Sequence, residues 1–170
     1  MLLLVSGLPG TGKSAVATRL AQDVRAVHLS VDEVEDAMLG AGLPRDRTTG
    51  VAAYEAVRAA AEQNLALGHS VVVDAVNDSA AARSTWHGAA ERAHVVLRFV
   101  HLTPPPTQEH QRRLTTRRRS LMYVPEPTWE QVQARAAIYE PWGSECLSID
   151  SAQPLAAVVS EIHRRLNSAT

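Results

Sequence analysis

The chain has 170 residues, of which 45% are hydrophobic and 21% charged, and its formal net charge is −1. This composition predicts a single domain over residues 1–170 and excludes a global positive field that would attract nucleic acid or an anionic membrane. The single cysteine, Cys146, cannot form an internal disulfide, and the apolar run at 2–5 is too short for a signal peptide or a membrane span. We therefore expect a cytoplasmic protein without membrane contact.

The first predicted strand, residues 2–6, leads into the stretch GLPGTGKS at 7–14 and a helix over 13–23. This stretch fits the pattern G-x-x-x-x-G-K-S, in which glycines turn the backbone so that N–H groups face a phosphate at the start of a helix. The motif predicts ATP and Mg²⁺ binding, with Lys13 bridging the terminal phosphates and Ser14 holding the metal. The alternative is a glycine-rich turn that binds no nucleotide. The predicted nucleotide-binding residues are Gly7, Leu8, Pro9, Gly10, Thr11, Gly12, Lys13, Ser14 and Ala15.

Lys13 is the only lysine among 17 basic residues. A compact ammonium group on a flexible stem suits a phosphate loop, where a wide guanidinium group would not fit. Its place at the one position that the motif prescribes supports the nucleotide-binding interpretation.

A second strand is predicted at 26–30, followed by a short helix at about 31–39 that carries Asp32 in its first turn. In a kinase, a carboxylate at this place accepts the proton of the attacking hydroxyl, so we predict that Asp32 is the general base and contacts the substrate. The alternative is stabilisation of the helix dipole by an acidic first turn. We interpret Glu33, Glu35 and Asp36 as residues that face solvent.

The polar stretch 40–50 is predicted to be a mobile loop, and a helix follows at 51–67. The next strand, 70–74, is the most hydrophobic of the chain and ends on Asp74. This carboxylate is predicted to hold Mg²⁺ or to orient a substrate; the alternative is an ordinary turn residue. Ala75 comes next, where many ATPases place a glutamate that activates water, so the sequence weakens the hydrolase interpretation.

Further elements are predicted as a helix at 79–92, strands at 95–102 and 145–149, and helices from 104, at 128–139 and at 154–166. The helix from 104 carries five arginines, which are Arg112, Arg113, Arg117, Arg118 and Arg119. We predict an Arg-rich lid at about 112–128 that closes over ATP, with Arg113 and Arg117 at the phosphates and Arg117 catalytic. A nucleic-acid patch and a solvated helix face are the alternatives. The histidines show no metal-like spacing, and the tryptophans are expected to pack against the core or the lid.

The alternation of strands and helices predicts an α/β fold with three layers, in which a five-stranded parallel sheet has helices on both faces. Ligands bind such sheets beyond the carboxyl ends of the strands. We therefore expect Gly7, Ser30, Asp32 and Asp74 to lie along one edge of the sheet.

Four stretches, GLPGTGKS, LSVDEVEDAM, GHSVVVDAVNDSAAR and RRLTTRRR, together resemble the small P-loop kinases. This group includes the kinase domain of bacterial polynucleotide kinase, chloramphenicol phosphotransferase and the gluconate and shikimate kinases. The resemblance covers residues 2–150 and implies the P-loop NTPase fold, with Asp32 as the general base. It also implies that Arg83, nine residues beyond Asp74, contacts the acceptor. The stretch 40–50 matches no known acceptor signature, and the long basic surface typical of polynucleotide binding is missing.

The sequence therefore predicts an ATP-dependent phosphotransferase that acts on a hydroxyl group of a small molecule such as a sugar, a nucleoside or an antibiotic. One alternative is a kinase for the 5′-hydroxyl of a polynucleotide, with nucleic acid as the less favoured partner. The other is a nucleotide-dependent ATPase or switch module, although no N-K-x-D segment for guanine is present.

Overall fold

The computed structural model describes residues 1–117 and 120–168, and this part of the chain forms one parallel sheet in the order β2-β3-β1-β4-β5. The strands are β1 (Leu2–Ser6), β2 (Val27–Ser30), β3 (Val71–Ala75), β4 (Leu97–Thr103) and β5 (Cys146–Asp150). The helices are α1 (Lys13–Val24), α2 (Val31–Gly40), α3 (Arg47–Ala66), α4 (Ala80–Arg92), α5 (Thr107–Thr116), α6 (Trp129–Ile138) and α7 (Leu155–Ser168). No helix in the described ranges combines the length and apolar character needed to span a bilayer.

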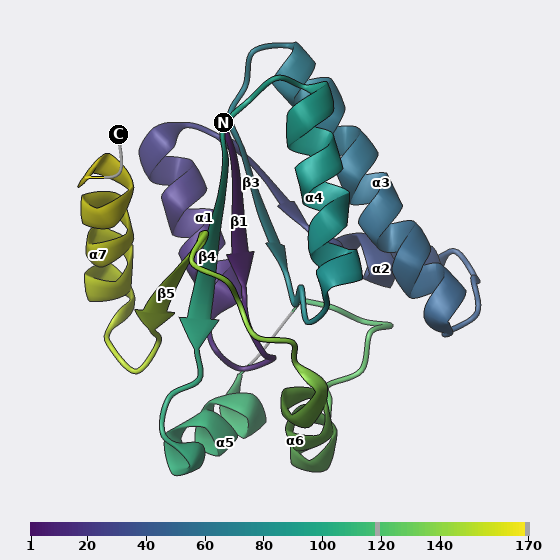
Figure 1. Ribbon diagram of the computed structural model, residues 1–170. Helices are drawn as coiled ribbons and strands as arrows, with labels where there is room; N and C mark the ends of the chain where they lie inside the picture. The colour runs from purple at the N-terminus through teal and green to yellow at the C-terminus, as the bar shows by residue number, and fades with distance from the viewer. Residues whose placement is uncertain (118–119, 169–170) are drawn as a thin grey trace.

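Both faces of the sheet are covered by helices, so the predicted three-layer α/β fold is confirmed (Figure 1). Side chains of a strand point alternately to opposite faces, and β1 follows this period of two. Leu2 and Leu4 pack with α3 and α4, whereas Leu3 and Val5 pack with α1 and α7. The central strands are apolar on both faces because neither face meets water.

Helix α3 begins at Arg47, four residues before the predicted start, and shortens the stretch that was expected to be a loop. The cause is a local cap: the Asp46 side chain accepts a hydrogen bond of 2.9 Å from the backbone N–H of Thr49. The hydroxyl of Thr49 in turn donates to the carbonyl of Pro44 at 2.6 Å. Gly50 therefore lies inside the helix, and the connection from α2 spans only residues 41–46.

Helices α5 and α6 lie beyond the carboxyl ends of the strands, at the end of the sheet where ligands are expected (Figure 1). They are joined to the phosphate loop by a small apolar cluster of Leu8, Leu114 of α5 and Val132 of α6. Helix α5 ends at Thr116, so it does not carry the whole basic run; Arg118 and Arg119 lie outside the described residues.

Asn77 ties the turn after β3 to the rest of the core. It is fully buried, and its backbone φ of 53° is in the left-handed region, which asparagine tolerates better than most residues. Its side chain donates to the Ser6 hydroxyl and accepts from the Trp86 indole N–H, both at 2.8 Å, and its backbone N–H donates to the Tyr54 hydroxyl at 3.2 Å. These bonds link β1, α3 and α4 to the turn that follows β3, the strand that carries Asp74.

Replacing Asn77 with alanine is expected to lower the free energy of unfolding by about 2–4 kcal/mol, because buried partners lose their bonds and alanine is strained at positive φ. Denaturant unfolding measures the change. Asn64→Ala is the matched control: that side chain bonds only within its own helix, to the carbonyl of Ala60 at 2.8 Å, so a loss of about 1 kcal/mol or less is expected. Equal losses of unfolding free energy in the two variants would show that the contacts of Asn77 contribute no more to stability than one hydrogen bond within a helix.

Candidate active site

The phosphate loop presents an uncapped helix end to a cavity. Gly12 precedes α1 with a φ of 91°, and no side chain caps the first turn. A Cβ atom at this position would meet no described atom within 4 Å, and Gly12 lines the cavity. The backbone N–H groups and the positive end of the helix dipole thus face a space that suits a phosphate.

The cavity at this loop, here called the loop cavity, has a volume of about 400 Å³. It is lined by Gly10, Gly12, Lys13, Ser14, Ala15, Asp32, Arg113, Thr116 and Arg117. All of these except Thr116 were singled out from the sequence. They come from the phosphate loop, the first turn of α2 and the end of α5, which the fold brings to one place.

The other residues of the phosphate loop shape it from inside. Gly7 leaves β1 so close to β4 that a Cβ atom would lie 2.8 Å from the carbonyl oxygen of Leu102, which excludes any larger residue. The Thr11 hydroxyl donates to the carbonyl of Leu8 at 2.9 Å, and the Pro9 carbonyl lies 2.8 Å from Nε2 of His110. Burial lowers the pKa of His110 below its usual value, so the neutral ring donates to this carbonyl. These contacts hold the loop in shape.

Asp74 is the most buried carboxylate of the site, and both of its oxygens are engaged. The Ser14 hydroxyl donates to Oδ1 at 2.9 Å, and Nε2 of His28 lies 2.7 Å from Oδ2. Asp74 is only 1% exposed and is the penultimate residue of β3, where it lies beside Val5 of β1 in the sheet. The contact with His28 was missed in the sequence, because a histidine on a neighbouring strand carries no signal in sequence spacing.

Ser14 and Asp74 are oxygen ligands of the kind that Mg²⁺ prefers. The described residues contain no cluster of three or more acidic, histidine or cysteine side chains that could hold a metal by themselves. The residues present therefore fit a cation that takes its remaining ligands from water and phosphate oxygens, as Mg²⁺ commonly does.

Asp32 lies where three cavities meet: it lines the loop cavity and two others. The second, the α6 cavity, has a volume of about 350 Å³ and is lined by Pro9, Asp32, Glu35, Leu39, Arg45, Val76, Arg117, Val124, Pro125, Pro127, Gln131, Val132 and Arg135. The third, the α3 cavity, has a volume of about 550 Å³ and is also lined by residues of α3, of α4 and of the segment before α4, among them Tyr54, Thr85 and Asp78. Both of these cavities border Asp32, and the α6 cavity also borders Pro9 of the phosphate loop.

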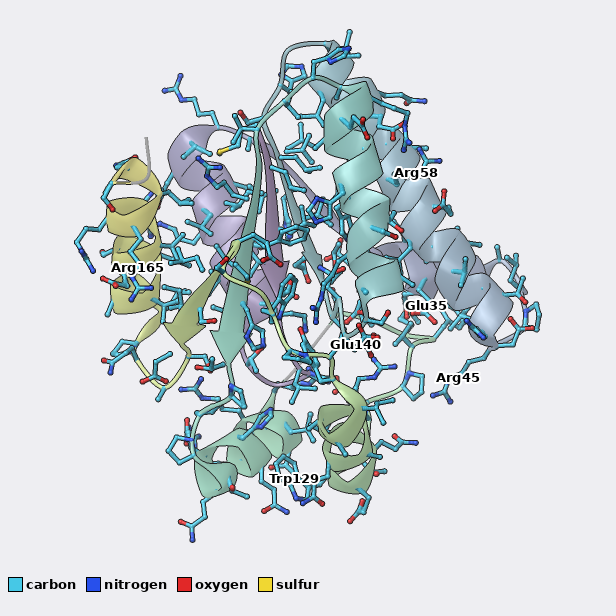
Figure 2. All side chains as sticks on the ribbon, in the orientation of Figure 1. Glu35, Arg45, Arg58, Trp129, Glu140 and Arg165 are labelled. Atoms are coloured by element: carbon cyan, nitrogen blue, oxygen red, sulfur yellow. The ribbon has the colours of Figure 1, made fainter. Side chains whose placement is uncertain are left out.

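The α6 and α3 cavities share charged residues of both signs. Glu35 lies one turn after Asp32, and burial together with the Asp32 carboxylate raises its pKa above the usual value. Arg135 pairs with Asp78 at 3.3 Å, and both line the α3 cavity. Figure 2 shows Glu35 and Arg45 at the same end of the molecule as α6. The expectation that Glu35 faces solvent was wrong, because α2 turns this residue toward the cavities.

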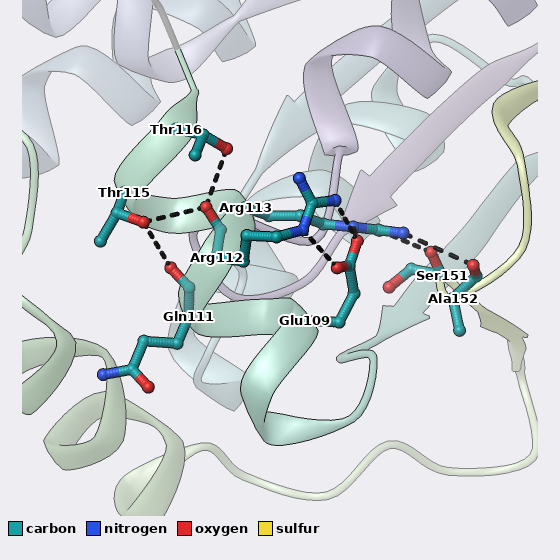
Figure 3. A network of polar contacts seen from close by, with 8 residues as sticks. All are labelled: Glu109, Gln111, Arg112, Arg113, Thr115, Thr116, Ser151 and Ala152. Carbon is teal, nitrogen blue, oxygen red and sulfur yellow. Dashed lines mark hydrogen bonds and ion pairs between the residues drawn. The ribbon is translucent and has the colours of Figure 1, made fainter.

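The arginines of α5 point in different directions. Arg113 lines the loop cavity, while its guanidinium group also donates to the carbonyl of Ser151 at 2.7 Å and pairs with Glu109 (Figure 3). Arg112 pairs with the same glutamate, and its side chain is 63% exposed. Arg117 lines both the loop cavity and the α6 cavity and pairs with Glu126. Arg113 and Arg117 are therefore at the site, and Arg112 is on the surface.

Arg83 lies away from the cavities. Its guanidinium nitrogens donate to the backbone carbonyls of Asn77, Glu140 and Pro141, and its charge lies 3.8 Å from the centre of the Trp142 ring. The side chain is buried and lines none of the three cavities. The structure thus gives Arg83 a role in fixing the segment after α6 and does not bring it to any of the three cavities, whereas the resemblance implied a contact with the acceptor.

The expectation of a solvent-facing Asp36 was also wrong. Its carboxylate accepts hydrogen bonds from three consecutive backbone N–H groups, at Met122, Tyr123 and Val124. These residues lie in the segment predicted as a lid. Their side chains give no sequence signal for this contact, because only backbone groups take part in it.

Residues 2–138 match the model of a protein family described as AAA domain. No curated protein sequence matches the chain. Among solved structures, a sugar kinase from Janibacter sp. HTCC2649 aligns with a TM-score of 0.73 and 17% identity, covering 98% of this chain and 94% of that one. A gluconokinase from Sinorhizobium meliloti 1021 aligns with a TM-score of 0.66 and 20% identity over 99% and 96% of the two chains.

Two further solved structures contain bound nucleotide analogues. The APS kinase of Mycobacterium tuberculosis, in complex with AMPPNP and APS, aligns with a TM-score of 0.71 and 20% identity over 98% and 96% of the chains. Kti12 of Chaetomium thermophilum, in complex with ADP-AlF3, aligns with a TM-score of 0.70 and 18% identity, covering 96% of this chain and 98% of that one. The chain therefore belongs to the AAA domain family and has the fold of the small P-loop kinases.

Proposed function

We propose that this protein transfers the γ-phosphoryl group of ATP to a hydroxyl group of a small molecule, with Asp32 as the general base. The observation that carries the proposal is the position of Asp32, whose side chain lines the loop cavity and both neighbouring cavities. A carboxylate between a phosphate site and an acceptor site can accept the proton of the attacking hydroxyl and align its oxygen.

Positive charge for the transfer comes from two residues of the loop cavity. Lys13 lies in the phosphate loop with its Nζ 3.4 Å from the carbonyl of Leu8, so its ammonium group is held over the loop. Arg117 borders the cavities on both sides of Asp32. Because the transferring group bears spread negative charge, cations fixed at these two places stabilise the transition state more than the ground state.

Ser14 and Asp74 would hold Mg²⁺, which supplies charge neutralisation at the phosphates when it is bound with ATP. The Asp74 carboxylate keeps the Ser14 hydroxyl oriented, and His28 holds the other oxygen of Asp74. These contacts fix the ligands before the nucleotide arrives, which lowers the reorganisation that binding requires.

A small-molecule acceptor is supported by the size and composition of the cavities beside Asp32. Volumes of about 350 and 550 Å³ lie in the range of sites for small ligands. Glu35 and Arg135 line both cavities, together with apolar residues such as Val132 in the α6 cavity and Val51 in the α3 cavity. This mixture suits a compact polar molecule. A polynucleotide would call for a continuous basic groove with stacking aromatic rings.

The similarity in fold to a sugar kinase, a gluconokinase and an APS kinase supports phosphoryl transfer. An ATPase is the weaker candidate, because Ala75 follows Asp74 and is itself buried, so no carboxylate stands there to activate water.

Asp32→Asn tests the role of the general base. Asparagine keeps the shape of the side chain but cannot accept the proton, so the rate of phosphoryl transfer should fall by about 100-fold or more while ATP affinity changes little. ADP release measures transfer, and calorimetry measures ATP binding.

Glu33→Gln serves as the control for this variant, because it removes a carboxylate from the same turn of α2 at an exposed position. It should leave the rate within about twofold of the original. Undiminished transfer by Asp32→Asn would refute the role assigned to Asp32.

Arg117→Met and Arg112→Met form a second matched pair. Both changes remove a guanidinium group near the end of α5, but only Arg117 borders the cavities. Arg117→Met should lower kcat by about 100-fold, as expected for a lost cation at the transferring phosphoryl group, and Arg112→Met should lower it by less than about twofold. Steady-state kinetics at saturating ATP distinguish the two. A similar loss in both variants would indicate a general effect of positive charge.

The class of acceptor can be determined by measuring ADP release with D-gluconate, adenosine, kanamycin and a 5′-hydroxyl oligonucleotide. We expect transfer to a small alcohol, with a KM that depends little on salt. A polynucleotide acceptor would instead bind less tightly as salt rises, because phosphate contacts release counterions. ADP release that no acceptor stimulates would support the ATPase alternative.

A further inference from the structure

Asp36 links α2 to the segment 120–128. Its Oδ1 accepts hydrogen bonds of 2.7 Å from the N–H groups of both Tyr123 and Val124, and its Oδ2 accepts one of 3.2 Å from Met122. Three successive N–H groups that converge on one anion form a backbone nest, here occupied by a carboxylate of the same chain. Such bonds to an ionised acceptor are stronger than bonds between neutral groups.

A close contact one turn later reinforces this link. The Tyr123 ring lies against the backbone of Gly40, where a Cβ atom would stand 2.7 Å from the ring. Only glycine at this position of α2 permits such an approach. The segment is thus held to α2 at two places, by polar bonds at Asp36 and by the ring at Gly40.

The segment held in this way is a wall of the α6 cavity. Val124 and Pro125, which adjoin the bonded N–H groups, line this cavity, and Asp32 and Glu35 line it from α2. None of the residues 120–128 lines the loop cavity, although Glu126 of this segment forms an ion pair with Arg117, which does. A shift of the segment away from α2 would therefore change the α6 cavity, where the acceptor is proposed to bind, more than the nucleotide site.

We propose that Asp36 is a positioning residue for acceptor binding. By bonding the N–H groups of 122–124, it keeps the wall formed by Val124 and Pro125 opposite the carboxylates of α2. Asp32 and Asp36 are four residues apart on the same helix, so one rigid element carries both the proposed base and the anchor of the wall that faces it. The acceptor part of this inference rests on the proposed function.

The test compares Asp36→Ala with Asp36→Asn and with the control Glu33→Ala, which removes an exposed carboxylate from the same helix. Hydrogen exchange should be about tenfold faster at the N–H groups of 122–124 in Asp36→Ala, because their acceptor is lost. Asparagine retains one oxygen acceptor and should restore part of the protection. Glu33→Ala should leave exchange in this segment unchanged.

The kinetic test compares the effect of each variant on the KM for the acceptor with its effect on the affinity for ATP. For the best acceptor among D-gluconate, adenosine and kanamycin, Asp36→Ala should raise KM by about tenfold, while the calorimetric Kd for ATP and the kcat at saturating acceptor change by less than about threefold. Asp36→Asn should lie between the original protein and Asp36→Ala. Gly40→Ala, which keeps the carboxylate and pushes the ring of Tyr123 away, should raise the same KM.

Two results would overturn the inference: unchanged exchange at 122–124 in Asp36→Ala, or an equal loss of ATP and acceptor affinity, which would indicate a general loss of structure. Failure of the proposed function looks different. In that case no acceptor stimulates ADP release by the unaltered protein, and the exchange experiment still decides whether Asp36 anchors the segment.

Discussion

The parallel pairing of β1 with β3 is the constraint on which the candidate site depends. Val5 is in register with Asp74, so the phosphate loop and this carboxylate leave the sheet at the same level and Ser14 can reach Asp74 at 2.9 Å. The pairing of β3 with β2 sets Ser30 beside Asp74 and thereby starts α2, with Asp32 in its first turn, at the same edge. A slip of one residue in either pairing would turn the side chains to the opposite face of the sheet and separate these groups.

Helix α2 connects the cavities at the edge of the sheet with the segment 122–124 before α6. Asp32 in its first turn and Glu35 in the next turn face the cavities, and Asp36 binds the backbone of the segment 122–124. The phosphate loop is supported from the other side, where Leu8 packs against α5 and α6. The site therefore lies between a rigid sheet edge and two short helices, and these contacts couple the helices to the sheet.

The sequence predicted the fold and the phosphate-binding end of the site because their signals are local. Strand, glycine turn and helix follow one another within residues 2–24, and Asp32 and Asp74 each lie at or just beyond a strand end, a place that chain order alone reveals. The contacts of His28 and Asp36 could not be predicted in this way. Each joins segments 46 or more residues apart, and its partner is a buried carboxylate or a backbone N–H group rather than a recognisable motif. Arg83 was misplaced for the same reason, since its partners are backbone carbonyls of the segment after α6.

The basic residues of the chain have a consequence for chemical labelling. Sixteen are arginines, and the sole lysine side chain borders the loop cavity. Amine-directed acylating reagents spare guanidinium groups, so the ε-amino group of Lys13 is the one side-chain amine of the sequence that they can modify. Its reaction would report on occupancy of the phosphate loop, in a molecule whose arginine charges the reagent leaves intact.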